Sequence, residues 1–217
     1  MAGLNRESED LHRIAMELTA ISQSALAYCT DRFDIERFHR VAEIGRDLLQ
    51  LVSRDELPPF SREVASTAGY TTPKIDVRGA VFDDDGRVLL VREILDDDLW
   101  TLPGGWCDIG ETPRGSIERE VLEEAGVAVR ARHLAAVLDR GVWGHQPPLD
   151  HHCYKMLFVC DALAPVDLAY RSDETSELGW FAVDDLPELS TSRILPEQIA
   201  LLHRHWENPG PAELDEA

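Results

Sequence analysis

Three glutamates, Glu120, Glu123 and Glu124, lie within little more than one turn of a predicted helix. Because each residue of an α-helix turns by about 100°, the three carboxylates share a sector of roughly 100°. Hard cations such as Mg²⁺ and Mn²⁺ prefer oxygen ligands, and a rigid ridge of carboxylates supplies them. The ridge therefore predicts a divalent-metal site. The helix alone leaves a solvated acidic face open as the alternative, because exposed like charges four residues apart cost only about 0.2–0.5 kcal/mol.

The spacing of the surrounding residues favours the metal site. The pattern has seven fixed positions and two apolar ones, over Gly105, Glu111, Arg119, Glu120, Val121, Glu123, Glu124, Gly126 and Val127. Seven fixed positions at ordinary residue frequencies would match by chance with odds on the order of 10⁻⁵ or less over a chain of this length. The stretch resembles the signature of the Nudix hydrolases, with every position filled.

The resemblance extends over nearly the whole chain except its acidic tail. The segments "FDIERF", "GYTTPKIDVRGAVF", "GGWCDIGETP" and "HQPP" are similar to one subgroup. That subgroup has a helical N-terminal domain and includes CDP-choline pyrophosphatases and ADP-ribose pyrophosphatases. The resemblance implies an α/β/α sandwich around a mixed sheet. It also implies hydrolysis of a nucleoside diphosphate linked to a group X, giving a nucleoside monophosphate and phosphorylated X.

The resemblance also assigns roles to residues in this sequence. Glu120, Glu123, Glu124 and the Gly105 carbonyl are expected to ligate Mg²⁺, with Mn²⁺ as a substitute. Glu120 and Glu123 thereby belong to the catalytic set. Arg119 is expected to orient the acids through ion pairs, and Glu111 to brace the loop against the helix. Many relatives take a further carboxylate from a loop as base or ligand, and the segment "SDETSELGWF" offers Glu174 and Glu177. A solvated loop is the alternative for both.

Substrate contacts are expected from three cations, one aromatic residue and one loop. Arg78, Arg92 and Lys155 lie on predicted strands, where each could meet phosphate oxygens or form an ordinary ion pair. Trp106 follows the double glycine and could line the site. The candidates on the loop "VWGHQPPLDHH" are His145 and Gln146, which could read a base or head group. His151 and His152 raise a zinc site, but no Cys, Asp or Glu spacing supports it.

The elements that must position these residues follow from periodicity. Apolar residues recur at helical spacing over 7–30 and again from Asp34, which could cap the second helix. The two faces carry Leu11, Ile14, Leu18 and Ile21, and Phe38, Val41, Ile44, Leu48 and Leu51. Strands are predicted from Lys74, with "DDDG" as a hairpin turn between the first two. Thr112, Pro113 and Gly126 suit the ends of the glutamate helix. We expect a helical domain over 1–66, an α/β domain over 67–206, and a flexible acidic tail over 207–217.

Composition narrows the class of partner. The net charge of −20 argues against nucleic acid, because phosphate backbones repel such a chain. No apolar run is long enough to span a bilayer, and no apolar signal segment opens the chain, so a cytoplasmic location and free thiols are expected. Apolar faces on both N-terminal helices predict a homodimer. The competing functions are a Nudix-fold nucleotide-sugar sensor without catalysis and an RNA-end pyrophosphohydrolase.

Overall fold

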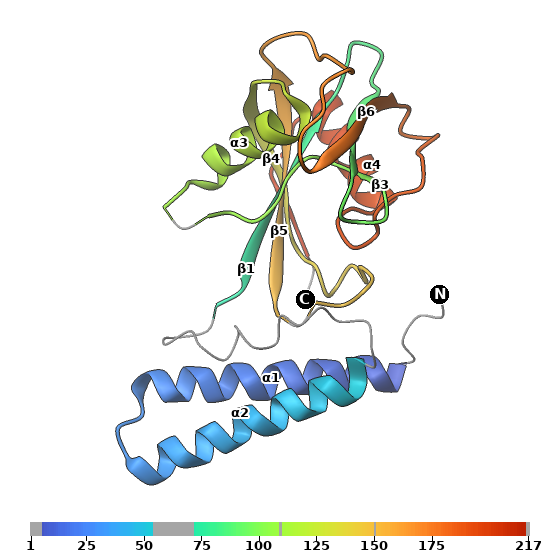
Figure 1. Ribbon diagram of the computed structural model, residues 1–217. Coiled ribbons are helices and arrows are strands. Elements are labelled where there is room, and N and C mark those ends of the chain that lie inside the picture. The colour runs from blue at the N-terminus through green and yellow to red at the C-terminus, as the bar shows by residue number, and fades with distance from the viewer. Residues whose placement is uncertain (1–5, 54–71, 109, 150, 216–217) are drawn as a thin grey trace. The chain divides into compact units, whose positions relative to one another are not determined.

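The computed structural model describes residues 6–53, 72–108, 110–149 and 151–215. These residues form two compact units, a pair of helices and an α/β unit that begins at Lys74. Each unit is coherent by itself, and the α/β unit carries every residue of the glutamate signature (Figure 1).

The N-terminal unit is an antiparallel pair of helices, α1 (Arg6–Tyr28) and α2 (Arg32–Ser53). Asp31 caps α2, since its carboxylate accepts hydrogen bonds from the amides of Phe33 at 2.9 Å and Asp34 at 3.1 Å. The prediction that Asp34 is the cap was therefore wrong. The helix begins earlier, and Asp34 lies in its first turn, where it pairs with Arg37 at 2.7 Å.

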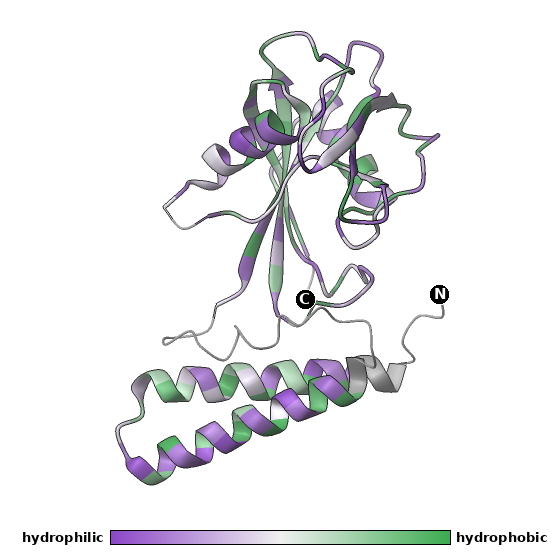
Figure 2. Cartoon of the chain, in the orientation of Figure 1, coloured by the Kyte–Doolittle hydropathy of each residue, from purple (hydrophilic) through white to green (hydrophobic). Residues whose placement is uncertain are grey.

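Small residues bring the two helices together. A Cβ atom at Gly45 would lie 2.6 Å from the Thr19 hydroxyl and 3.1 Å from the Ala15 carbonyl, so only glycine allows this approach. Ala15 and Thr19 are buried there. Leu49 is buried as well, whereas several other large apolar residues on both helices are exposed. Apolar and polar residues alternate along the two helices in Figure 2.

The α/β unit contains two sheets and two helices. The first sheet has the order β1-β5-β4-β7, over Lys74–Val81, Cys153–Ala162, Val129–Asp139 and Glu213–Leu214. The second has the order β3-β2-β6, over Leu99–Thr101, Val88–Glu93 and Thr175–Phe181. The helices are α3 (Pro113–Ala125) and α4 (Pro196–Glu207). β1 and β5 are parallel, whereas β4 and β5 are antiparallel, so the first sheet is mixed, as predicted.

Two apolar clusters hold the layers together, one under each helix. Val77 and Val81 of β1 pack in the cluster that contains Ile117 and Val121 of α3. The alternate residue Ala80 packs in the cluster that contains α4. Successive strand residues point to opposite faces, so β1 serves both clusters. This arrangement is the predicted α/β/α sandwich.

The "DDDG" segment turns the chain without forming the predicted hairpin. The Asp83 carboxylate accepts the amides of Asp85 and Arg87, and one isolated bridge joins Phe82 to Val88. Beyond this bridge, β1 pairs with β5 over its whole length, while β2 pairs with β3 and β6. The turn was recognised correctly, but the strands that it joins enter different sheets.

The C-terminal segment differs from the flexible tail that we expected. Glu213 and Leu214 form β7, which pairs in parallel with Ala136 and Val137 of β4. The Asp215 carboxylate accepts hydrogen bonds from the Trp143 indole at 2.7 Å and from the Asp139 amide. These specific acceptors order the segment, although its composition alone is typical of disorder.

Candidate active site

Helix α3 is held at both ends by the residues that the sequence indicated. The Thr112 hydroxyl accepts the Gly115 amide at 3.1 Å, Pro113 opens the helix, and Gly126 ends it at a φ of 66°. Ile117 and Val121 are fully buried against the sheet. A Cβ atom at Gly79 of β1 would lie 3.0 Å from both side chains, so this glycine sets how closely α3 approaches β1. The glutamate ridge is therefore carried by a firmly anchored helix.

Arg119 organises the exposed side of the ridge. Its guanidinium donates to Glu111 at 2.9 and 3.0 Å and to Glu123 at 2.8 Å, and it pairs with Glu120 at 3.0 Å. The hydrogen bond from Arg119 lowers the pKa of Glu111. One planar fork thus braces the preceding loop and orients two of the carboxylates.

Glu124 forms the buried side of the ridge. Its side chain is 4% exposed and accepts the Gly104 amide at 2.9 Å. Burial raises the pKa of Glu124 to about 8, and burial also raises the pKa of Glu120. Gly105 lies beside Glu120, where an added Cβ atom would be 3.0 Å from a carboxylate oxygen. The Gly105 carbonyl already accepts the Val77 amide at 2.8 Å, which leaves it one further lone pair.

A second buried carboxylate, Glu93 at the end of β2, was missed by the sequence analysis. One of its oxygens pairs with Arg193 at 3.0 Å, and the other has no hydrogen-bond partner within the described part of the chain. Its charge acts on Glu124, and burial raises the pKa of Glu93. The available signal was its place two residues after the apolar run "VLLV", close to a predicted buried strand where a carboxylate is unusual.

This chemistry fits a hard divalent cation. Buried carboxylates with raised pKa values and an unpartnered carboxylate oxygen together call for positive charge, and all the donors are oxygen atoms. Within the described residues, no three Asp, Glu, His or Cys side chains form a ready ligand set, because Glu120 and Glu123 are turned to Arg119. The ridge can hold a cation once these two carboxylates leave the guanidinium.

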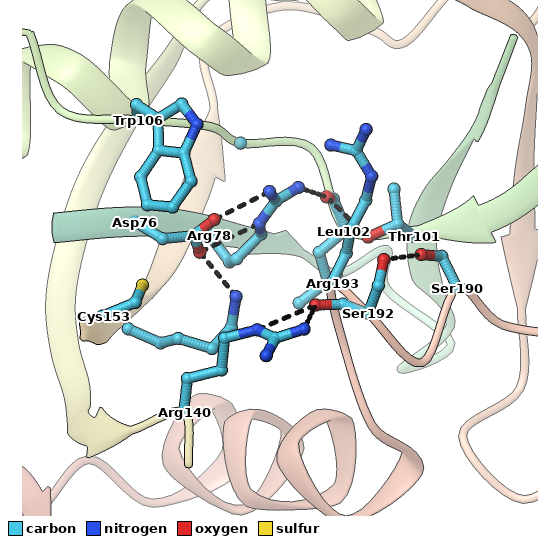
Figure 3. Close-up of polar contacts among 12 residues, drawn as sticks. Asp76, Arg78, Thr101, Leu102, Trp106, Arg140, Cys153, Ser190, Ser192 and Arg193 are labelled. Carbon is cyan, nitrogen blue, oxygen red and sulfur yellow. Dashed lines mark hydrogen bonds and ion pairs between the residues drawn. The ribbon is translucent and has the colours of Figure 1, made fainter. Parts of the chain in front are cut away.

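A network of cations lies next to the ridge. Arg78 donates two hydrogen bonds to Asp76, at 2.9 and 3.1 Å, and one to the Leu102 carbonyl at 3.1 Å (Figure 3). Lys155 donates to the same Asp76 carboxylate at 2.7 Å. Although burial raises the pKa of Asp76, the charges of Arg78 and Lys155 hold it at about 2. Burial lowers the pKa of Lys155 to about 8. Arg78 and Lys155 are thus brought together, as members of a buried ion-pair network.

The other residues predicted to contact substrate differ in exposure to solvent. Trp106 is 43% exposed and forms an antiparallel bridge with Asp76. His145 is buried, with one ring nitrogen on the Thr191 carbonyl at 2.9 Å and the other on Gln198 at 3.0 Å. Both ring nitrogens of His145 are therefore occupied by protein groups in this conformation. Gln146 is exposed on the same loop.

The candidate carboxylates on β6 and the preceding loop face β2. Glu177 is opposite Arg92 in the strand register and pairs with it at 3.3 Å. Arg92 also donates to the Asp98 carbonyl at 2.7 Å, so it belongs to this pair and not to the Asp76 network. Glu174 is exposed, and its charge acts on Glu93. No zinc set forms around His151 and His152 among the residues described.

Comparison with known proteins agrees with this geometry. Residues 72–204 match the model of the NUDIX domain. The chain belongs to the Nudix family. Residues 9–59 match a second model, described as a UDP-X-like, N-terminal oligomerisation domain. The chain is thus a Nudix hydrolase with an N-terminal helical domain, and Nudix hydrolases generally use divalent metal ions.

Two relatives match over most of the chain, and a third matches over two thirds of it. A putative ADP-ribose pyrophosphatase of Bacillus subtilis is 35% identical over 195 residues, which is 90% of this chain and 91% of the relative. A crystal structure of a UDP-X diphosphatase is similar with a TM-score of 0.60 and 32% identity, covering 96% of this chain and 99% of that one. A crystal structure of an ADP-ribose pyrophosphatase from Streptococcus suis has a TM-score of 0.56 and 35% identity, covering 66% of this chain and 98% of that one.

No described helix is long and apolar enough to cross a membrane.

Proposed function

We propose that this Nudix hydrolase is a Mg²⁺-dependent pyrophosphohydrolase that cleaves a small nucleoside diphosphate linked to a group X. The products are a nucleoside monophosphate and phosphorylated X. The observation that carries the proposal is the juxtaposition of the acidic ridge with cations, since the charge of Arg78 acts on both Glu120 and Glu124. The diphosphate of the substrate carries two negative charges and needs both groups. Carboxylates bind the metal ion that neutralises it, and cationic side chains bind its oxygen atoms directly.

The printed descriptions of the relatives support this substrate class. Two of the relatives are described as ADP-ribose pyrophosphatases and one as a UDP-X diphosphatase, and all three names describe a nucleoside diphosphate joined to a further group. CDP-choline and ADP-ribose were the substrates expected from the sequence. The net charge of −20 disfavours RNA ends as the substrate.

Each group of residues at the site has its own role in the proposed hydrolysis. Glu120, Glu123 and Glu124, with the Gly105 carbonyl, would hold Mg²⁺, which would supply neutralising charge for the diphosphate and would make bound water more acidic. Arg119 keeps the acids in place until the cation binds, and Arg78 stabilises the charge of the bridge. Glu174 or Glu177 accepts the proton of the attacking water. A rigid helix suits this role, because preorganised charges stabilise a transition state without rearrangement.

The first test is metal dependence combined with substitution of the ridge. Activity on a panel of nucleoside diphosphate derivatives should vanish with EDTA and return with Mg²⁺ or Mn²⁺. Glu123→Gln and Glu124→Gln should each lower kcat by at least about a hundredfold. Glu197→Gln, an exposed glutamate on α4, is the matched control and should keep full activity. Full activity of either ridge variant at saturating metal would exclude the assigned ligands.

Product analysis tests the bond that breaks. The expected products are a nucleoside monophosphate and phosphorylated X. When the reaction runs in ¹⁸O-labelled water, one of the two products should carry ¹⁸O in its phosphate, which identifies the phosphorus that is attacked. Release of inorganic phosphate as the first product would indicate a different class of enzyme.

We also propose that the protein is a homodimer that associates through α1 and α2. Several of their larger apolar side chains are exposed in the single chain, among them Ile14, Ile21, Ile44 and Leu51, and the family description of this segment names oligomerisation. Two-fold closure is the commonest arrangement of such contacts.

A further inference from the structure

Tyr170, in the segment between β5 and β6, contacts the C-terminal end of the glutamate helix α3. Its hydroxyl donates a hydrogen bond to the backbone carbonyl of Glu123 at 3.0 Å. The two residues are 47 positions apart in the sequence, so the folding of the α/β unit brings them together. Tyr170 thus reaches one of the proposed Mg²⁺ ligands through the backbone of that residue.

The Glu123 carbonyl needs a donor from outside the helix. The last four carbonyls of an α-helix have no amide partner within it. At the end of α3, the Gly126 amide donates to the Leu122 carbonyl at 3.0 Å, and Gly126 turns the chain away at a φ of 66°. The next carbonyl, that of Glu123, accepts the hydroxyl of Tyr170. Tyr170 therefore supplies a hydrogen bond that the helix cannot make for itself, and it restrains the last turn.

The ring of Tyr170 makes a second contact with the same turn. A Cβ atom at Gly126 would lie 2.4 Å from the ring, so the ring fills the space that a side chain at this position would need. The ring also packs against the apolar cluster that contains Val121 and Ala125 of α3. The end of the helix is thus fixed by packing as well as by the hydrogen bond.

The segment that presents Tyr170 is ordered by its own hydrogen bonds. The Asp167 carboxylate accepts the Ala169 amide at 2.9 Å, and the Asp167 carbonyl accepts the Tyr170 amide at 3.0 Å. The Arg171 guanidinium donates to the carbonyls of Leu168 at 2.8 Å and Tyr170 at 2.6 Å. These bonds hold the tyrosine independently of α3, as a group that restrains the helix requires.

Of the ridge carboxylates, that of Glu123 depends most on the end of the helix. Glu124 is buried and accepts the Gly104 amide at 2.9 Å. The Glu120 side chain lies one turn earlier and is only 12% exposed. The Glu123 side chain is 58% exposed, and within the described residues its carboxylate is paired with Arg119 alone. Once this carboxylate leaves Arg119 for a cation, the backbone of the last helical turn determines where its oxygens lie. Helix ends fray, so a restraint on this turn bears directly on Glu123.

We propose that Tyr170 is a positioning residue that holds Glu123 in place for the divalent cation. It acts through the Glu123 carbonyl, so no contact with the metal or the substrate is required. The inference rests on the proposed function, in which Glu123 is a ligand of Mg²⁺. Loss of the hydroxyl should weaken metal binding, because the cation must then order the helix end as it binds. The rate at saturating Mg²⁺ should change little, because the ligand set is complete once the cation is bound.

Calorimetric titration of the metal-free, full-length protein with Mn²⁺ alone tests the effect on binding. Tyr170→Phe keeps the ring on Gly126 and removes only the hydroxyl. We expect the Kd for Mn²⁺ to rise by about three- to tenfold, as for the loss of one hydrogen bond. The matched control is Arg132→Met, which removes a hydrogen bond of 3.2 Å to the Trp206 carbonyl in the last turn of α4 and should keep the wild-type Kd. A Tyr170→Phe protein with the wild-type Kd would overturn the proposal, whatever its Tm.

A double-mutant comparison separates this role from a merely structural one. If Tyr170 acts through Glu123, Tyr170→Phe should change the Kd for Mn²⁺ by less than about twofold when Glu123→Gln is already present. An equal change of Kd with and without Glu123→Gln would show that Tyr170 supports the fold in general, and would also overturn the proposal.

Turnover distinguishes this inference from the proposed function. With a nucleoside diphosphate derivative that the wild type hydrolyses, Tyr170→Phe should raise the Mg²⁺ concentration for half-maximal activity by about three- to tenfold. It should keep kcat at saturating Mg²⁺ within about twofold of the wild type, and a loss of about tenfold there would contradict a role in metal binding alone. If the wild type binds Mn²⁺ but hydrolyses no such derivative, the proposed function fails, while the titrations still decide the role of Tyr170. If the wild type does not bind Mn²⁺, both proposals fail.

Discussion

At the scale of single residues, burial and pairing give chemically identical groups different properties. Glu111 and Glu124 flank the same ridge, yet the Arg119 guanidinium lowers the pKa of Glu111, whereas burial raises that of Glu124 to about 8. Arg78 and Arg140 differ in the same way, since one shares a carboxylate and the other meets only carbonyls. The residue types of the ridge could be assigned from spacing. These differences between like residues could not, because they depend on neighbours that are distant in sequence.

The geometry of the Arg119 fork gives the first prediction. Arg119→Lys keeps the positive charge but cannot bridge Glu111, Glu120 and Glu123 at once, because an ammonium group lacks a planar fork. We expect kcat to fall by about tenfold or more and the Mg²⁺ concentration for half-maximal activity to rise. Steady-state kinetics across a Mg²⁺ titration measures both. Arg114→Lys, an exposed arginine on the same helix, is the control, and equal kinetics of the two variants would contradict the bracing role.

The buried His145 predicts a dependence of stability on pH. Burial lowers the pKa of His145 to about 4, against about 6.5 in an unfolded chain. Between these values the unfolded state binds more protons, so stability falls as the pH falls through 6.5. The expected loss between pH 7 and pH 5 is about 2 kcal/mol. His145→Gln should be less stable than the wild type at pH 7 but should lose about 2 kcal/mol less over this interval.

Urea unfolding at pH 7 and pH 5 measures this difference. All five tryptophans lie in the α/β unit, so their fluorescence reports on the unit that contains His145. A variant with the same pH dependence as the wild type would show that His145 titrates normally.

At the scale of elements, the sequence was sufficient to predict an element whose stabilising residues lie within it or next to it in the chain. Helix α3 could be predicted because Thr112, Pro113 and Gly126 act within a few residues of its ends. The hairpin after β1 could not, because the partner of β1 is β5, more than seventy residues further along. The ordered C-terminus was missed for the same reason, since the two N–H groups that donate to the Asp215 carboxylate belong to β4 and to the loop after it.

Strand β7 gives a prediction about stability. A chain that ends after Gly210 loses the pairing of β7 with β4, the hydrogen bonds of Asp215, and the contact between Glu213 and His205 at 3.1 Å. At about 0.5–1.5 kcal/mol for each hydrogen bond, the two bonds of Asp215 and the one between Glu213 and His205 alone predict a loss of about 1.5–4.5 kcal/mol and a Tm lower by several degrees. Thermal unfolding followed by tryptophan fluorescence tests this, because Trp143 is a direct partner of Asp215. A chain that ends after Asp215 is the control, and equal Tm values for both truncations would mean that β7 contributes nothing.

At the scale of the whole molecule, the helical unit exposes a group of large apolar side chains on its surface. The residues buried between α1 and α2 include Ala15, Thr19 and Gly45, whose side chains are small or polar. Ile14 and Ile21 are 39% and 53% exposed on α1, and Ile44 and Leu51 are 44% and 72% exposed on α2. The sequence analysis identified both apolar stripes, but the helix pair covers them only in part: Leu18 and Leu48 are half-buried, whereas the four residues above are exposed. Exposed apolar side chains grouped on one surface are typical of a protein–protein contact.

The exposed stripe predicts how the proposed dimer can be broken. Ile14→Glu combined with Ile44→Glu places charges within both apolar ridges, and burying these charges in an interface would cost far more than the contact gains. Light scattering at micromolar concentration should give a dimer for the wild type and a monomer of 24.4 kDa for the double variant. Gln50→Glu adds charge at an exposed position about 120° away from Ile44 around α2 and should remain dimeric.

If the double variant stays dimeric, or if the wild type is a monomer, these helices do not form the contact. If the double variant is monomeric yet hydrolyses the same substrate at the wild-type rate, each copy holds a complete active site. A loss of activity on separation, with the α/β unit still folded by tryptophan fluorescence, would mean that the partner copy contributes to the site.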